Sequence, residues 1–129
     1  HSRDAAQDTI QIMRASRAEE IGGVIHCYSY SKESARDFLN MGFYFGIGGV
    51  VTFKNAKKLK EAVAYIPLSN IVLETDAPYL TPEPFRGKRN DSSKLTYVAQ
   101  AIADIKQIPV DEVYAETWKN AHQMYKIQK

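Results

Sequence analysis

Three short apolar segments alternate along the chain with segments of helical periodicity. The apolar segments span residues 22–28, 43–48 and 71–76, and they are rich in β-branched and aromatic residues. Their apolar character is nearly continuous, which is typical of strands buried on both faces of a parallel sheet. The pattern therefore predicts three strands at these positions.

Apolar residues spaced three and four positions apart predict helices around these strands, the first over residues 4–17. Ser31 is the predicted N-cap of the second helix, which ends at Gly42. Asn55 is the predicted N-cap of the third, which Pro67 stops. The apolar positions expected on the helices are Ala6, Ile10 and Met13; Ala35, Phe38 and Leu39; Leu59, Ala62 and Val63; Leu95, Val98, Ile102 and Ile105; and, after Pro109, Tyr114, Trp118, Ala121 and Tyr125 on one face.

Strands that alternate with helices predict right-handed βαβ units and an α/β fold with a parallel sheet. Three strands, or four if His1 ends another, leave the sheet with two open edges. A small doubly wound sheet and one half of an eight-stranded barrel both fit this order, since a whole barrel needs about 200 residues or more. The chain has 129 residues and starts at His1, so we expect it to be a piece of something longer.

Composition narrows the function classes only slightly. The chain is 44% hydrophobic and 25% charged, as globular domains are, and its formal net charge of +2 is too balanced to indicate a nucleic-acid binder by itself. No apolar run approaches the roughly 20 residues that cross a bilayer, so no membrane partner is predicted. A single cysteine, Cys27, cannot form an internal disulfide, which favours a reducing cytoplasmic location.

Candidate metal ligands stand where strands are expected to end. His1, His26 and Asp76 would gather at the carboxyl edge of a parallel sheet. Imidazole and carboxylate groups suit Zn²⁺ or Mn²⁺ and tolerate Mg²⁺. The alternatives are a hydrogen-bonded core histidine and an ordinary Asp-Ala-Pro turn. However, Glu74 and Asp76 place two carboxylates on one face of an apolar strand, which requires a metal, an arginine or a hydrogen-bond network.

A long loop, residues 77–93, follows the third strand and carries Arg86, Lys88 and Arg89 around Gly87. Loops of this length in compact domains are usually functional or disordered. Three cations beside a candidate catalytic aspartate suit a phosphate clamp, and a solvated basic loop is the alternative.

These motifs resemble, in order and spacing, the TatD family of metal-dependent deoxyribonucleases in the amidohydrolase superfamily. The resemblance runs along the whole chain and is carried by four segments: His1-Ser2-Arg3-Asp4-Ala5, Gly23-Val24-Ile25-His26-Cys27-Tyr28-Ser29, Leu73-Glu74-Thr75-Asp76-Ala77-Pro78-Tyr79-Leu80-Thr81-Pro82 and Arg86-Gly87-Lys88-Arg89-Asn90. It implies the C-terminal half of one TIM-like (β/α)₈ barrel domain over residues 1–129, with strands five to eight and their helices.

The resemblance also implies roles for individual residues. His1, His26 and Asp76 would be metal ligands, and Asp76 would also take the proton of the attacking water. Glu74 would support them as a neighbouring carboxylate. The substrate phosphates would lie near four cations, which are Arg3, Arg86, Lys88 and Arg89. Two divalent ions (Mg²⁺, Mn²⁺ or Zn²⁺) would serve as cofactors.

Two departures from the family pattern are visible. The family's N-terminal His-x-His pair and the glutamate that ends its fourth strand have no counterpart, because they belong to the other half of the barrel. Where the family commonly has Phe-Ser-Gly, this chain has Tyr28-Ser29-Tyr30, so Tyr30 is expected to alter the wall of the cleft.

The resemblance implies hydrolysis of DNA phosphodiesters, from the 3′ end of single-stranded or frayed substrates. The chain alone is expected to be inactive, with the N-terminal half of the barrel as its partner, as a separate or nicked chain. Two alternatives remain: an amidohydrolase-type metallohydrolase that acts on a non-nucleic-acid substrate, and a non-catalytic half-barrel.

Overall fold

The computed structural model describes residues 1–127 and contains three strands, five α-helices and four short 3₁₀ helices. The strands are β1 (Val24–Ile25), β2 (Tyr44–Ile47) and β3 (Ile71–Leu73). The α-helices are α1 (Ala6–Ala15), α2 (Lys32–Asn40), α3 (Lys57–Tyr65), α4 (Leu95–Lys106) and α5 (Val110–Met124). The 3₁₀ helices are η1 (Ala18–Glu20), η2 (Gly49–Thr52), η3 (Leu68–Asn70) and η4 (Ser92–Lys94).

The strands form one parallel sheet in the order β1-β2-β3, which confirms the predicted fold class. Ile25, Phe45 and Ile71 lie side by side in the register, so they share one face of the sheet. All three strands are shorter than the apolar segments that predicted them. Within residues 1–127 no fourth strand ends at His1, because residues 1–5 are irregular.

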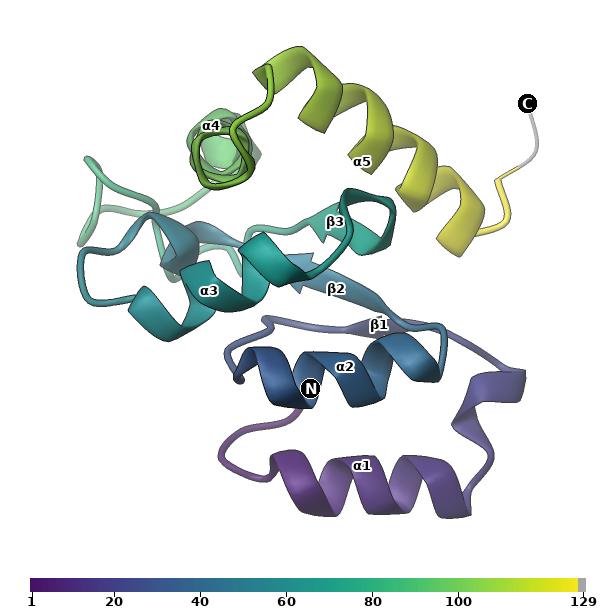
Figure 1. The fold of residues 1–129 in the computed structure, drawn as a ribbon. Helices are drawn as coiled ribbons and strands as arrows, with labels where there is room; N and C mark the ends of the chain where they lie inside the picture. Colours follow the sequence, from purple (N-terminus) through teal and green to yellow (C-terminus); the bar gives the residue numbers. More distant parts are fainter. Residues whose placement is uncertain (128–129) are drawn as a thin grey trace.

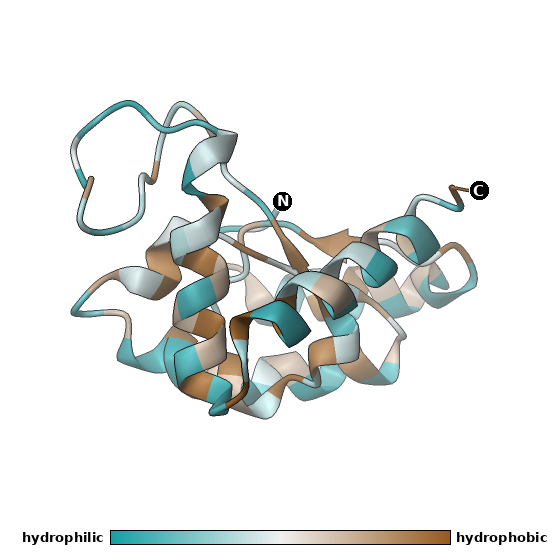
Figure 2. Ribbon diagram, turned by 90° about the horizontal axis from the view of Figure 1, so that it is seen from above, coloured by the Kyte–Doolittle hydropathy of each residue, from teal (hydrophilic) through white to brown (hydrophobic). Residues whose placement is uncertain are grey.

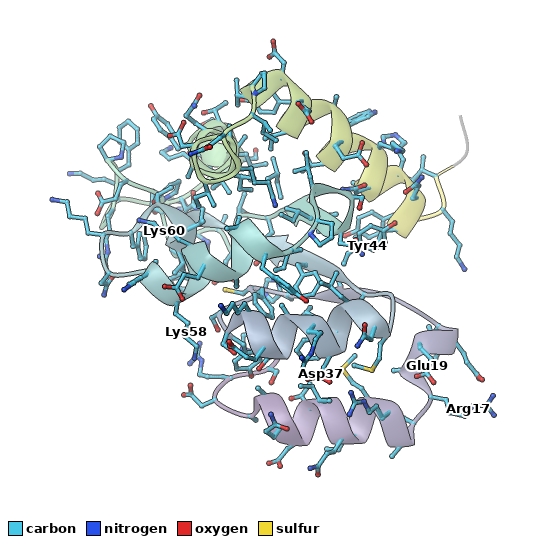
Figure 3. All side chains as sticks on the ribbon, viewed as in Figure 1. Arg17, Glu19, Asp37, Tyr44, Lys58 and Lys60 are labelled. Atoms are coloured by element: carbon cyan, nitrogen blue, oxygen red, sulfur yellow. The ribbon has the colours of Figure 1, made fainter. Side chains whose placement is uncertain are left out.

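Figure 1 shows α1 and α2 below the strands and α4 and α5 above them. In the view from above, the helices lie on one side of the strands and the N-terminus lies on the other (Figure 2). The core fills the space between sheet and helices. Phe45 on β2 and Phe38 on α2 are fully buried, and the Tyr28 ring meets both edge to face. Outside this core, Asp37 lies between α1 and α2 (Figure 3), where it accepts a 2.5 Å hydrogen bond from Arg14.

Local signals set the helix ends with one exception. The Ser31 side chain accepts a hydrogen bond from the Ser34 backbone N–H, so the predicted N-cap of α2 is confirmed. The predicted Asn55 cap is wrong: the cap residue of α3 is Ala56, with no side-chain hydrogen bond. The Ala56 N–H donates to the carbonyl of Phe53, and this turn delays the start of the helix by one residue.

On the last helix, α5, the buried face includes two polar residues, and the aromatic residues lie on the exposed face. Val113, Thr117 and Asn120 are buried on α5, and the Asn120 side chain donates 2.8 Å hydrogen bonds to the carbonyls of Leu68 and Ile71. The aromatic residues expected on one face do share one, but it is solvent-exposed, with the Trp118 side chain 64% exposed. Asn120 decides this orientation, because it satisfies two carbonyls where β3 begins.

No helix in the described part of the chain has the length and apolar character that crossing a membrane requires.

We expect Phe38→Ala to lower the free energy of unfolding by about 3–5 kcal/mol, because it removes a fully buried ring and leaves a cavity. Urea denaturation followed by circular dichroism measures this change. Ile12→Ala is the control, because Ile12 on α1 is 64% exposed and its loss should change stability by less than about 0.5 kcal/mol. Equal effects of the two substitutions would contradict the core described above.

Candidate functional site

On the helix-free face of the sheet, the central strand β2 has no side chain at Gly46. Gly46 pairs with Val72 of β3, and Glu74 follows one step further along the same face. A Cβ atom on Gly46 would lie 1.9 Å from Oε2 of Glu74 and 2.8 Å from its Cδ. The missing side chain of Gly46 therefore provides the space that the Glu74 carboxylate occupies over the middle strand.

From this position Glu74 reaches His26, which follows β1 on the far side of β2. The Nδ1 atom of His26 lies 2.8 Å from Oε2 of Glu74. An ionised carboxylate only accepts hydrogen bonds, so Nδ1 is the donor, and in the neutral ring the lone pair is then on Nε2. The Glu74 side chain is only 15% exposed, whereas His26 is 37% exposed. The carboxylate thus holds the ring from the interior and leaves Nε2 accessible.

The free nitrogen faces the second carboxylate. Nε2 of His26 lies 3.4 Å from Oδ1 of Asp76, whose side chain is 37% exposed. Asp76 has a φ of +55°, so the extended backbone ends before it and the strand alternation no longer applies. Glu74 and Asp76 both approach His26 as their spacing suggested, but they reach opposite edges of its ring.

His1 joins this group from the N-terminal segment. Its ring centroid lies 5.6 Å from that of His26, with the two planes tilted by 48°. The segment is tied down by Tyr30, whose hydroxyl lies 2.5 Å from Oγ of Ser2 and accepts a hydrogen bond from the Ala5 N–H. Tyr30 is 8% exposed, so the residue that departs from the family pattern is a buried anchor for the segment carrying His1.

The donor atoms fit a divalent ion in part. Two ligands that each lie about 2.1 Å from a tetrahedral ion are about 3.4 Å apart, which is the separation of His26 Nε2 and Asp76 Oδ1. The carboxylate on Nδ1 is the usual support of a metal-binding histidine. Within residues 1–127, however, no three His, Cys, Asp or Glu side chains already converge as a ligand set. The structure places His26 beside Asp76 and the His1 ring beside the His26 ring, without closing the three around one point.

The electrostatics of the site are dominated by its carboxylates. Burial raises the pKa of the Cys27 thiol, the negative charges of Glu74 and Asp76 raise it further, and the Arg3 guanidinium lowers it. These influences place Arg3 within electrostatic reach of the site. Oε1 of Glu74 is buried and has no hydrogen-bond partner among the described residues, so this carboxylate oxygen remains available to a donor or cation.

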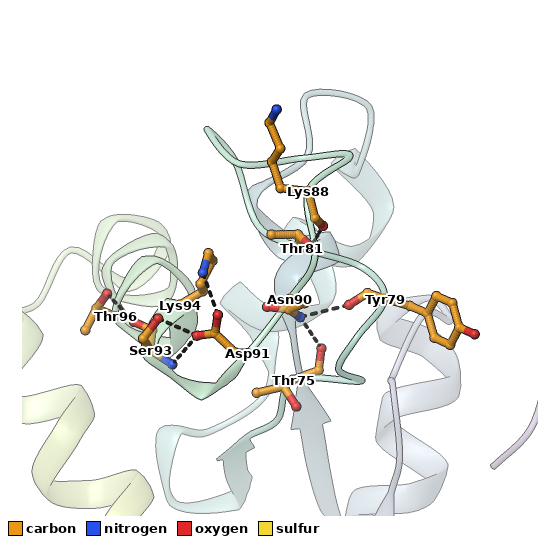
Figure 4. A network of polar contacts seen from close by, with 9 residues as sticks. All are labelled: Thr75, Tyr79, Thr81, Lys88, Asn90, Asp91, Ser93, Lys94 and Thr96. Atoms are coloured by element: carbon orange, nitrogen blue, oxygen red, sulfur yellow. Dashed lines mark hydrogen bonds and ion pairs between the residues drawn. The ribbon is translucent and has the colours of Figure 1, made fainter.

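The loop after β3 is held by hydrogen bonds instead of regular secondary structure (Figure 4). The Asn90 side chain donates to the carbonyls of Thr75 (2.7 Å) and Tyr79 (2.8 Å), and the Thr81 hydroxyl donates to the Lys88 carbonyl. Asn90 is 4% exposed, so this last residue of the Arg-Gly-Lys-Arg-Asn segment is a structural clamp. These contacts give the loop one defined conformation.

The predicted phosphate-binding cations occupy two places. Arg86, Lys88 and Arg89 line one hollow in the loop, and the Arg86 guanidinium lies 4.0 Å above the centre of the Phe53 ring. Arg3 is outside this hollow and acts electrostatically on the Cys27 thiol, whose pKa it lowers. Sequence reasoning missed Gly46 and the anchoring role of Tyr30. A glycine in a strand interior was a usable signal, because it marks a close approach of other atoms.

Comparison with known proteins gives a consistent family. The sequence profile described as TatD related DNase matches residues 1–126. The chain is 47% identical over 127 residues to "Uncharacterized metal-dependent hydrolase YabD" of Bacillus subtilis (strain 168), covering 98% of this chain and 50% of that protein. It is 40% identical over 127 residues to "Uncharacterized metal-dependent hydrolase YcfH" of Escherichia coli (strain K12), covering 98% and 48%. The chain therefore spans about half the length of these relatives and corresponds to their C-terminal half.

Solved structures agree with the sequence relatives. The TatD homologue YJJV of Escherichia coli K12 superposes with a TM-score of 0.90 at 26% identity, over 99% of this chain and 49% of that one. An uncharacterized amidohydrolase of Saccharomyces cerevisiae matches with a TM-score of 0.81 at 15% identity, over 96% and 52%, which shows the fold alone. The predicted half-barrel architecture is confirmed.

We expect Gly46→Ala to separate Glu74 from His26, because the new Cβ would overlap the carboxylate. The proton on Nδ1 of His26 then loses its acceptor, and the ring shifts toward the other tautomer. ¹⁵N NMR of the histidine side chains measures the tautomer. Asp104→Ala on α4 is the control, because the Asp104 side chain is exposed and hydrogen-bonds the Gln100 side chain of the same helix. An unchanged Nδ1–H tautomer in Gly46→Ala would show that Glu74 does not set the ring.

Proposed function

Because the chain belongs to the TatD-related DNase family, we propose that it supplies half of the active site of a divalent-metal-dependent hydrolase that cleaves DNA phosphodiesters. The observation that carries this proposal is the His26 ring held between two carboxylates, with Nδ1 bonded to Glu74 and Nε2 facing Asp76. The named relatives from B. subtilis and E. coli are metal-dependent hydrolases by description, which supports metal use. Single-stranded or frayed 3′ ends are the proposed substrates.

Three side chains would hold divalent ions, namely His1, His26 and Asp76. Mg²⁺, Mn²⁺ and Zn²⁺ all suit this mixture of nitrogen and oxygen donors, and we propose two ions in the complete site. When bound, such ions supply the charge that lowers the pKa of water from about 15.7 to about 7 and offsets charge on the phosphoryl group. Glu74 keeps the His26 ring in the tautomer that exposes Nε2.

Asp76 is the proposed base. Its carboxylate is reachable from solvent, and its backbone turn is fixed by the Tyr79 N–H, which donates to the Asp76 carbonyl at 2.9 Å. Asp76 accepts the proton of the attacking water, and Arg3 and the loop cations hold the phosphate for in-line attack. A neutral amide or ester substrate would leave Arg86, Lys88 and Arg89 without a function, which favours the phosphodiester.

We further propose that residues 1–129 form the C-terminal half of one barrel domain, completed by an N-terminal half. Within residues 1–127 the outer edges of β1 and β3 are unpaired, and no helix covers the second face of the sheet. The exposed Trp118 and Tyr114 on α5 border a hollow of about 340 Å³ with Leu73 and Leu95. The missing half would cover these surfaces, whether it is joined to this chain or is a separate polypeptide.

A cytoplasmic location accompanies this proposal. The one cysteine, Cys27, is a free thiol, and free thiols persist in reducing compartments. Fractionation of cells that express the protein tests the location.

In a full-length protein that carries this chain, we expect Asp76→Ala to lower metal-dependent cleavage of single-stranded DNA by at least about 100-fold, because the water loses its base and the site a ligand. Cleavage of a 3′-labelled oligonucleotide with Mg²⁺, Mn²⁺ or Zn²⁺ measures the loss. Asp104→Ala on α4 is the control, because the Asp104 side chain is exposed and accepts a hydrogen bond from Gln100 on the same helix. Full activity of Asp76→Ala would end the proposal, and hydrolysis of amides or esters alone would replace the substrate.

The isolated 129-residue chain is expected to bind Mn²⁺ or Zn²⁺ weakly and to cleave no DNA, because three side chains are too few to hold two ions. Isothermal titration calorimetry and the same cleavage assay measure both properties. Addition of the N-terminal half of the B. subtilis relative should restore activity if the two halves assemble. Turnover by the chain alone would contradict the proposal that the second half completes the site.

A further inference from the structure

The loop after β3 borders a hollow of about 500 Å³, which is lined by the loop cations that the proposed reaction places near the substrate phosphates. Its lining contains three cations and no acidic residue, together with Phe53, whose ring lies under Arg86, and Tyr79. A volume of this size is within the range of small-ligand sites. The Tyr79 ring is 71% exposed and extends away from the hydrogen-bond network of the loop (Figure 4).

The hollow is preformed, because the backbone around it is fixed from below. A Cβ on Gly49 of η2 would lie 2.0 Å from the Leu80 carbonyl oxygen, so the loop rests directly on that glycine. The Glu83 N–H donates a 2.8 Å hydrogen bond to the Thr52 hydroxyl on the same 3₁₀ helix. Arg86 is fixed as well, since its guanidinium lies flat against Phe53 at a distance of 4.0 Å.

The hollow is also linked to the hydrolytic site through one turn. Tyr79 donates its backbone N–H to the Asp76 carbonyl, and Asn90 bonds the carbonyls of Thr75 and Tyr79. Asp76 and Tyr79 therefore keep a fixed spacing along the chain, at the two ends of one turn. A chain-like substrate that is cleaved beside Asp76 would pass over Tyr79 within one or two of its units.

We propose that this hollow binds one nucleotide of a single-stranded DNA next to the cleaved bond. The base stacks on the Tyr79 ring, and its phosphate meets Lys88 and Arg89, while Arg86 contributes a fixed positive charge. Aromatic rings beside cations are the usual means of holding single strands without reading their sequence. This inference rests on the proposed function for its substrate, but it assigns the subsite to residues outside the His26–Asp76 centre.

Binding without cleavage tests the subsite. The probe is a short oligo(dT) with one 2-aminopurine, whose fluorescence falls on stacking, titrated with this chain in EDTA. We expect Tyr79→Ala to weaken binding by at least about fivefold and to remove the quenching, whereas Tyr79→Phe retains both. Tyr125→Ala is the matched control, because Tyr125 at the end of α5 is 70% exposed and lies outside the loop. Arg89→Ala should reduce the slope of log affinity against log salt by about 0.7.

The outcomes separate the subsite from the hydrolytic reaction. Unchanged binding by Tyr79→Ala, or no binding by the wild-type chain, overturns the subsite whatever the cleavage assay shows. Normal Tyr79-dependent binding with no cleavage by the full-length protein would leave the subsite and reject the reaction. A ribonucleotide oligomer and thymidine monophosphate are titrated in the same way. Tighter binding of either one would show that it, and not single-stranded DNA, is the ligand of the hollow. The titration is repeated with a full-length protein that carries this chain, so that an isolated variant that fails to fold is not mistaken for one that fails to bind.

Discussion

The candidate site depends on one hydrogen bond that crosses the middle of the sheet. Glu74 leaves the end of β3, passes over the position where Gly46 has no side chain, and accepts the Nδ1 proton of His26 beyond β2. Three strands thus contribute to one contact: the first ends at the imidazole, the second provides space, and the third provides the carboxylate. The direction of Nε2 toward Asp76 follows from this bond, since a ring held at one nitrogen has its other nitrogen fixed.

The loop that follows β3 is also held by hydrogen bonds from a buried side chain. It has few backbone partners of its own, and a buried amide side chain supplies them. Asn90 donates to the carbonyls of Thr75 and Tyr79 and thereby joins the end of the loop to its beginning. A buried polar group is stable only when it is hydrogen-bonded, so Asn90 specifies one conformation for the turn that carries Asp76. Order at this site thus comes from side chains that satisfy the backbone.

The sequence predicted the parts of the fold that periodicity controls. Leu59, Ala62 and Val63 recur with helical spacing and are buried on α3, and the continuous apolar segments became a parallel sheet. Periodicity could not predict the strand ends, because Asp76 leaves the extended conformation through its own φ of +55°. Periodicity also did not predict which face of α5 is buried. The buried face carries Asn120, which bonds two backbone carbonyls, and the aromatic residues are exposed.

The sequence predicted which residues form the site, but only part of how they contact one another. His26, Glu74 and Asp76 were identified from chemistry and from their positions after strands, and they do meet. The roles of Gly46 and Tyr30 depend on contacts between segments distant in sequence: Gly46 with Glu74, and Tyr30 with Ser2. A glycine inside a strand signals a close approach of other atoms but does not say which atoms approach, and a tyrosine gives no such signal.

The same asymmetry explains why the functional side of this molecule is its less packed side. The helices bury Phe38, Phe45 and Ile71 against one face of the sheet, which supplies the apolar stabilisation. The opposite face holds His26, Glu74 and Asp76, and a carboxylate oxygen there has no partner among the described residues. A buried carboxylate oxygen without a partner is costly, so further donors or cations would stabilise that face. A second half-barrel and divalent ions would provide both, which makes the completion of the fold and the assembly of the site the same physical event.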